Sequence, residues 1–187
     1  MVDAIPTDGG FPVDSQEGPD QALDRLAVAL AAGSPRSFPW WESARALSVS
    51  HMQDRRAATP VRARWAECAL RAVDGKESLG GQSPLRAVAE RLRVHAYLLD
   101  LLGADLGNPE GQLHAVLLAA RALIGDAPEL HRKSAAELSR MRLDEVVRLR
   151  DIKNALPAIV QICATLPADS ELRAWADSWQ SVATALP

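Results

Sequence analysis

Apolar side chains recur at every third or fourth position through most of the chain, which is the spacing that places them on one face of a helix. Glycine or proline separates these segments, and three segments open where proline follows threonine, serine or asparagine. No segment alternates apolar and polar residues as a half-buried strand does. The pattern predicts a helix that begins at Pro39 and further helices over 21–33, 60–75, 84–103, 109–125, 129–153 and 170–185. After the helix over 129–153, Pro157 is expected to kink or restart the chain.

About seven helices with short connections form a helical bundle, so the sequence predicts an all-α fold. A length of 187 residues is typical of one domain with a substantial core, and we expect a single domain over 21–187. Residues 1–20 combine proline, glycine and aspartate with few apolar side chains, so they bury too little surface to offset the entropy of ordering. We therefore expect 1–20 to be a disordered, flexible acidic tail.

Two adjacent tryptophans stand near the start of the second helix, in a chain with one tyrosine and two phenylalanines. At about 100° per residue, Trp40 shares a narrow stripe with Ala44, Leu47 and His51, whereas Trp41 lies at the edge of that stripe. The stripe predicts that Trp40 is a core residue and that Trp41 lies at the boundary, where an indole can keep its N–H in water. Trp41 is therefore a candidate anchor for a protein partner.

Trp175 and Trp179 belong to a second apolar seam, on the last helix. Its members follow a three-four spacing and are Leu172, Trp175, Trp179, Val182 and Leu186. A continuous seam of this kind packs either against the rest of its own domain or against another chain. The second alternative makes Trp175 and Trp179 candidate partner-binding residues and allows a homo-oligomer through the final helix.

Composition excludes several classes of protein: 48% hydrophobic and 24% charged residues are average for a globular domain and not for a disordered or collagen-like chain. The longest apolar stretch, 155–166, is shorter than the about 20 residues that span a bilayer, so we expect no membrane insertion. The formal net charge of −3 gives no strong attraction to nucleic acid. Arginine far outnumbers lysine and the N-terminus lacks the pattern of a secretory signal, which favours a bacterial, cytoplasmic protein.

Charge is unevenly distributed along the chain. Residues 1–28 hold six acidic groups and one basic group, whereas Arg55, Arg56, Arg62 and Arg64 surround one predicted inter-helix turn. Arginines this close can hold an acidic partner or phosphate groups through charge-assisted hydrogen bonds. These four arginines are candidate partner-binding residues. The acidic N-terminal residues could fold over the arginines and be displaced when a partner binds.

His51 and His95 stand on the apolar faces of two different predicted helices. They could meet in the core and, with Cys68 or Cys163, bind a metal or a small ligand. No H-x3-H, HExxH or CxxC spacing supports such a site, and isolated cysteines are usually buried thiols, so we expect neither a metal nor a cofactor. A nucleophile motif of the G-x-S-x-G kind is also missing, which favours a protein that is not an enzyme.

Residues 135–156 loosely resemble a helix-turn-helix unit, with a possible turn at 142–144. The second helix would begin with Asp144 and Glu145 and then alternates the sign of its charges, as a solvent-exposed helix face does. The sequence thus favours a non-catalytic interaction protein: an adaptor, a chaperone-like accessory protein or a subunit of a larger bacterial assembly that binds another protein. The alternatives are a DNA-binding regulator using this segment and a small-ligand or metal site between the two histidines.

Overall fold

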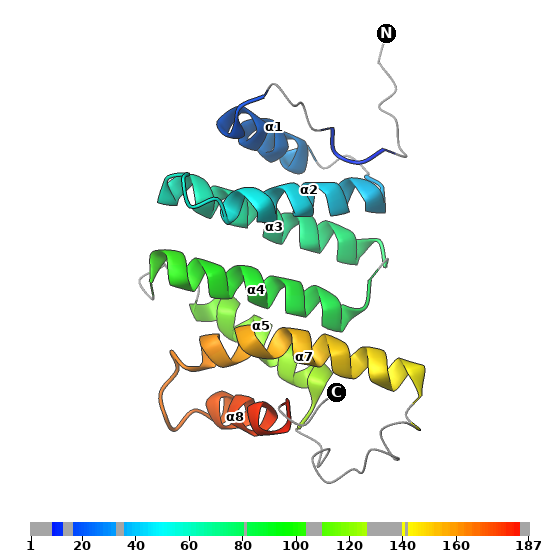
Figure 1. Ribbon diagram of the computed structural model, residues 1–187, viewed down its shortest axis with the longest axis vertical. Helices are drawn as coiled ribbons and strands as arrows, with labels where there is room; N and C mark the ends of the chain where they lie inside the picture. Colours follow the sequence, from blue (N-terminus) through cyan, green and yellow to red (C-terminus); the bar gives the residue numbers. More distant parts are fainter. Residues whose placement is uncertain are drawn as a thin grey trace. The chain divides into compact units, whose positions relative to one another are not determined.

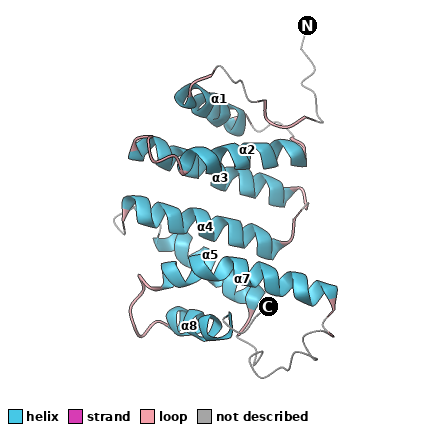
Figure 2. Ribbon diagram, viewed as in Figure 1, coloured by secondary structure: helices cyan, strands magenta, loops and turns pink. Residues whose placement is uncertain are grey.

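The computed structural model of the protein describes residues 9–12, 17–32, 36–80, 82–103, 110–126, 140 and 142–183 (Figures 1 and 2). Its helices are α1 (Pro19–Ala31), α2 (Phe38–Met52), α3 (Thr59–Ser78), α4 (Pro84–Leu102), α5 (Glu110–Ile124), α7 (Leu143–Cys163) and α8 (Glu171–Ala183). No strand occurs within the described ranges. The predicted all-α fold is confirmed for these residues.

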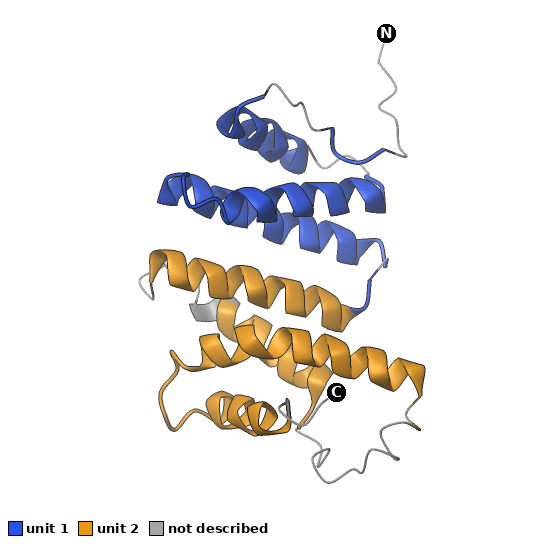
Figure 3. Ribbon diagram, viewed as in Figure 1, with its two compact units in different colours: residues 1–83 blue, residues 84–187 orange. Residues whose placement is uncertain are grey.

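The chain divides into two compact units, residues 1–83 and residues 84–187 (Figure 3). Unit 1 contains α1, α2 and α3, and unit 2 contains α4, α5, α7 and α8. Each unit buries apolar residues of its own. The prediction of a single domain over 21–187 is therefore not confirmed.

Prolines and glycines mark most helix ends where the sequence predicted them. Prolines in the first turn of α2, α3 and α4 are Pro39, Pro60 and Pro84. At these positions the missing N–H costs no helical hydrogen bond. Gly103 and Gly125 follow α4 and α5 with φ of 74° and 76°, and each N–H donates to the carbonyl four residues earlier, at 2.9 and 2.8 Å. Such a left-handed glycine ends a helix while satisfying a carbonyl of its last turn.

The prediction that a helix ends at Gly75 is wrong, because α3 continues through Gly75 to Ser78. Gly75 lies against the indole of Trp41, and a Cβ at this position would overlap the ring. The glycine therefore allows α2 and α3 to approach closely and does not end the helix. From the sequence alone, a glycine of this kind cannot be distinguished from a helix-ending one.

α7 is one helix through Pro157, so the chain does not restart there. Pro157 itself is exposed, whereas Leu156 and Ala158 on either side of it are buried in the core of unit 2. The packing of this face offsets the loss of the one helical hydrogen bond that proline cannot donate. Arg93 also donates to the carbonyl of Asn154, at 3.1 Å, in the turn that precedes the proline.

The core of unit 2 draws on all four of its helices. Its fully buried large side chains include Leu92, Leu117, Ile152, Ile159, Ile162 and Trp179. The described members of the predicted seam on α8 are all buried in this core: Leu172, Trp175, Trp179 and Val182. The seam thus packs within its own unit, and Leu186 lies outside the described residues.

In unit 1, α2 runs antiparallel to α3. Trp41 and Glu42, near the start of α2, contact Gly75 and Lys76, near the end of α3. His51, near the end of α2, contacts Trp65, near the start of α3. The buried residues of α2 recur every four positions and are Trp40, Ala44, Ser48 and Met52. Such a row is the i, i+4 stripe of a helix that packs along one side.

Part of the predicted tail packs on this core. Phe11 is buried, its ring meets that of Trp40 edge-on at 5.5 Å, and the guanidinium of Arg25 lies 4.5 Å from its centroid. Arg25 also pairs with Glu17 at 2.6 Å. Phe11 and Glu17 are therefore anchored to unit 1, whereas the sequence predicted a flexible tail over 1–20. Most of the other residues before α1 lie outside the described ranges, and flexibility stays a prediction for them.

An ion pair between a buried lysine and a partly exposed glutamate links α2 to α3. Lys76 is 1% exposed, and its Nζ lies 2.5 Å from Oε2 of Glu42, which also pairs with Arg45. Burial alone would raise the pKa of Glu42, but the hydrogen bonds and charges of Arg45 and Lys76 outweigh it and lower this pKa from 4.5 to about 2. Glu42 is therefore ionised at neutral pH and supplies the counter-charge that the buried ammonium group requires.

We predict that Gly75→Ala destabilises the protein, although the same change at an open helix position stabilises by about 0.5–1 kcal/mol. The reason is that the new methyl group displaces the indole of Trp41. In a Trp41→Ala background the same substitution should stabilise, because the space against Gly75 is then free. Chemical unfolding of the wild type, both single variants and the double variant measures these changes. Equal effects of Gly75→Ala in the two backgrounds would contradict the close contact.

We also predict that stability falls as the pH drops from about 4.5 to about 2, in part through Glu42. Its folded pKa lies below the unfolded value, so its contribution is fully present above pH 4.5 and is lost as the carboxylate is protonated. Glu42→Gln should flatten the dependence of the unfolding free energy on pH in this window. Glu67→Gln, at an exposed position of α3, is the control and should leave the slope unchanged. Identical slopes for the two variants would exclude a role for the pair of Glu42 with Lys76.

Candidate protein-interaction surface

The turn between α2 and α3 is held by hydrogen bonds among its own residues. The N–H of Asp54 donates to the carbonyl of His51 at 3.2 Å, and the N–H of Ala57 donates to the carbonyl of Asp54 at 3.1 Å. The carboxylate of Asp54 also accepts from the N–H of Arg56, at 3.0 Å. An aspartate bonded to the backbone two residues on is a common stabiliser of tight turns. Residues 53–58 therefore have a defined backbone.

Arg62 ties the start of α3 to the end of α2. Its Nε donates to the carbonyl of Met52, the last residue of α2, at 3.1 Å. A cation at this end of a helix also faces the negative pole of the helix dipole. Arg62 is partly buried, and its role in the structure is to close the turn.

Arg64 is paired within unit 1. Its Nη2 lies 2.7 Å from Oδ1 of Asp24 on α1, and the two side chains are 54% and 69% exposed. The hydrogen bond with this carboxylate raises the pKa of Arg64. The pair connects α1 to α3, but a pair as exposed as this stabilises a fold only weakly. Asp24 is one of the acidic residues in 1–28 that the sequence predicted could cover the arginines.

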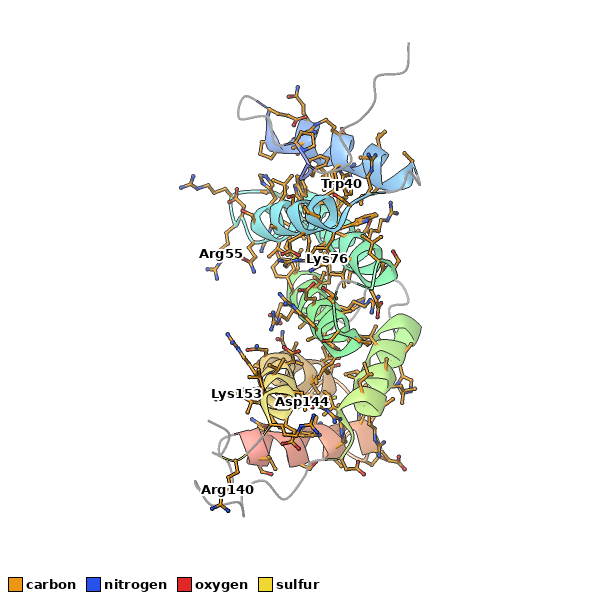
Figure 4. All side chains as sticks on the ribbon, turned by 90° about the vertical axis from the view of Figure 1, so that its right-hand side faces the viewer. Trp40, Arg55, Lys76, Arg140, Asp144 and Lys153 are labelled. Atoms are coloured by element: carbon orange, nitrogen blue, oxygen red, sulfur yellow. The ribbon has the colours of Figure 1, made fainter. Side chains whose placement is uncertain are left out.

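Arg55 and Arg56 are the two members of the predicted cluster that remain available. Both are exposed, and neither guanidinium forms a hydrogen bond or an ion pair with a residue that the structure describes. Figure 4 shows Arg55 pointing away from the helices into solvent. The structure thus divides the four arginines: Arg55 and Arg56 face solvent, Arg62 holds the turn, and Arg64 pairs with Asp24.

Trp41 lies at the opposite end of α2 from this turn. Its ring meets that of Trp40 edge-on at 4.9 Å and covers Gly75, and it is half-buried. Trp40 is 6% exposed. The prediction that Trp40 belongs to the core and Trp41 to its boundary is confirmed. The exposed edge of Trp41 is separated from the arginine turn by the length of α2.

Trp175 and Trp179 are buried in unit 2, with exposed fractions of 4% and 1%. Both indole N–H groups donate to the carbonyl of Gly125, at 2.8 and 3.0 Å. These bonds satisfy the buried indole donors and tie α8 to the end of α5. A partner could reach neither ring without opening unit 2, so we assign both residues to the core and not to the partner-binding set.

His51 and His95 lie in different units. His51 stacks on Trp65, with ring centroids 4.6 Å apart and 21° between the planes, and His95 is 9% exposed. Within the described parts of the chain, no three His, Cys, Asp or Glu side chains gather as metal ligands do. Burial raises the pKa of Cys68 and of Cys163 to about 11, so both are protonated thiols at neutral pH. A ligand site between the two histidines stays a prediction.

The helix-turn-helix candidate at 135–156 lies partly outside the described residues, as does the predicted helix start near residue 129; the structure describes residue 140 and residues 142–156 of this segment. The guanidinium of Arg148 donates to the last two carbonyls of α5, at 3.0 and 3.5 Å. It therefore caps the end of a neighbouring helix, where a recognition helix would need it to face outward.

An apolar face that the sequence pattern does not predict is exposed at the start of α7. Leu143, Val146 and Val147 are 79%, 44% and 50% exposed. Their spacing of three and four residues places them on one side of the helix, opposite the buried row that includes Ile152 and Ile159. The spacing is a signal that the sequence carries, but the alternating charges of the same segment obscure it.

Comparison with models of protein families, with curated proteins and with solved structures found no match to this chain. None of the helices in the described ranges is both long enough and apolar enough to cross a membrane. The functional assignment therefore depends on the geometry of the molecule itself, and above all on the two solvent-facing arginines of the α2–α3 turn.

We predict that Arg148→Met destabilises the protein by about 0.5–1.5 kcal/mol, because it removes a charge-assisted cap from the carbonyls of α5. Arg150→Met removes an exposed arginine from the same helix and should change the unfolding free energy by less than about 0.5 kcal/mol. Chemical unfolding measures both. If Arg148→Met left stability unchanged and abolished a sequence-selective complex with DNA, the helix-turn-helix alternative would be correct.

Proposed function

We propose that this protein is a non-catalytic interaction protein that binds an acidic surface of a partner protein, as an adaptor, a chaperone-like accessory protein or a subunit of a bacterial cytoplasmic assembly. The observation that carries the proposal is the pair of solvent-facing guanidinium groups of Arg55 and Arg56, on a turn with a defined backbone. In this proposal, carboxylates of the partner are the ligands of the two arginines.

Arginine suits this role because its planar guanidinium group binds a carboxylate through two parallel hydrogen bonds. Among the described residues, neither Arg55 nor Arg56 has an internal carboxylate to release before it binds. The hydrogen-bonded backbone of the turn also limits the conformational entropy that is lost on binding. Both features make Arg55 and Arg56 the primary contacts, because the guanidinium groups of Arg62 and Arg64 are engaged in the free protein.

The charge content of the turn favours a protein partner over nucleic acid. Residues 53–58 offer two solvent-facing cations, Arg55 and Arg56, beside one carboxylate, Asp54. DNA-binding proteins usually contact several phosphates with clustered cations and place a helix or a two-stranded ribbon in a groove. Arg148, in the segment that the DNA-binding alternative would use, is engaged with α5. No second function is therefore proposed.

The test uses the full chain and a fluorescently labelled polyglutamate peptide as a simple acidic partner. We predict that the double variant Arg55→Gln/Arg56→Gln binds the peptide about tenfold more weakly, because two exposed charge-assisted pairs together contribute about 1.4 kcal/mol. Its affinity should also depend less on salt, because fewer charges remain to be screened. Fluorescence anisotropy over a range of salt concentrations measures both quantities.

Arg71→Gln/Arg140→Gln is the matched control, because it removes two exposed positive charges outside the turn (Arg140 is labelled in Figure 4). We expect this control to retain most of the affinity. Equal losses in the two double variants would show that only total charge matters and would contradict the proposal. Tighter binding of duplex DNA than of polyglutamate, lost in Arg55→Gln/Arg56→Gln, would instead identify a nucleic-acid surface.

A further inference from the structure

We infer that Arg64 is a third contact to the acidic partner and that Asp24 occupies it in the free protein. The carboxylate on α1 would then compete with the partner for one of three arginines. This inference rests on the proposed function, since it requires that Arg55 and Arg56 bind carboxylates. It adds an internal competitor that lowers the affinity for weakly acidic surfaces.

Arg64 lies near the turn along the axis of α3. It stands five residues after Thr59, the first residue of the helix, which is an axial rise of about 8 Å. An extended acidic segment covers this distance with about three residues. A partner that is seated on Arg55 and Arg56 and also extends along α3 would bring a further carboxylate within range of Arg64.

The pair of Arg64 with Asp24 can exchange at little cost. Its atoms lie 2.7 Å apart, but both side chains are more than half exposed, so water and salt screen the interaction. A carboxylate of the partner replaces that of Asp24 with an equivalent bond to the same guanidinium group. The number of ion pairs on Arg64 is the same before and after the exchange.

α1 does not have to leave unit 1 for this exchange. Leu23 and Leu26 are fully buried and anchor the helix, whereas Asp24 between them is exposed. Only the side chain of Asp24 has to turn away from Arg64. The competitor is thus one carboxylate on a fixed helix, which makes its effect on affinity measurable without a change of fold.

Asp24→Asn tests the inference, because it removes the competing charge and nearly keeps the size of the side chain. We predict that the full chain then binds polyglutamate about threefold more tightly, as expected when an exposed ion pair no longer competes. In an Arg64→Gln background, Asp24→Asn should leave the affinity unchanged, because no cation remains to be released. Fluorescence anisotropy of the four proteins completes a double-mutant cycle.

Asp20→Asn is the matched control, because it removes an acidic charge from the same helix at an exposed position. It should tighten binding much less than Asp24→Asn, whose wild-type residue bonds Arg64 directly. Equal gains from the two variants, or a gain from Asp24→Asn that persists in the Arg64→Gln background, would overturn the inference. In either case, weaker binding by Arg55→Gln/Arg56→Gln would still support the proposed function, whereas unchanged binding by that variant would overturn both proposals.

Discussion

The close antiparallel packing of α2 on α3 is the interaction on which the candidate surface depends. Gly75 lets the indole of Trp41 lie against α3, and the adjacent Glu42 pairs with Lys76, which is 1% exposed. A shift of α2 along α3 by one helical turn would separate Glu42 from this buried ammonium group, which costs more than a rearranged apolar contact. The pair therefore favours the observed register of the two helices. The same register brings the end of α2 to Arg62 and so determines the turn.

Much of the helix layout could be predicted because the signals are local. Prolines in a first turn and left-handed glycines after a last turn act within a few residues of the chain. Gly75 and Pro157 depart from these rules because packing decides them: one lies under an indole of another helix, and the other is flanked by buried side chains. The division into two units likewise depends on which helices pack together, which periodicity does not specify.

The candidate site could be predicted only in part, for a related reason. The sequence places four arginines around one turn, but it does not show which carbonyl or carboxylate each one meets. Arg62 and Arg64 find their acceptors ten and forty residues away in the chain. In the same way, the apolar seam of the last helix is evident in the sequence, whereas only the folded chain shows that Trp175 and Trp179 both donate to Gly125.

Internal pairing explains how a protein with a net charge of −3 can present a positive surface. In unit 1, Glu17 pairs with Arg25, and Glu42 pairs with both Arg45 and Lys76. These carboxylates are committed to cations away from the α2–α3 turn, so they do not neutralise the guanidinium groups that face solvent there. At physiological ionic strength, charges more than about 8 Å apart in water are largely screened. The proposed partner would therefore respond to the local charges of the turn, which are those of Arg55, Arg56 and Asp54, and not to the acidic balance of the whole chain.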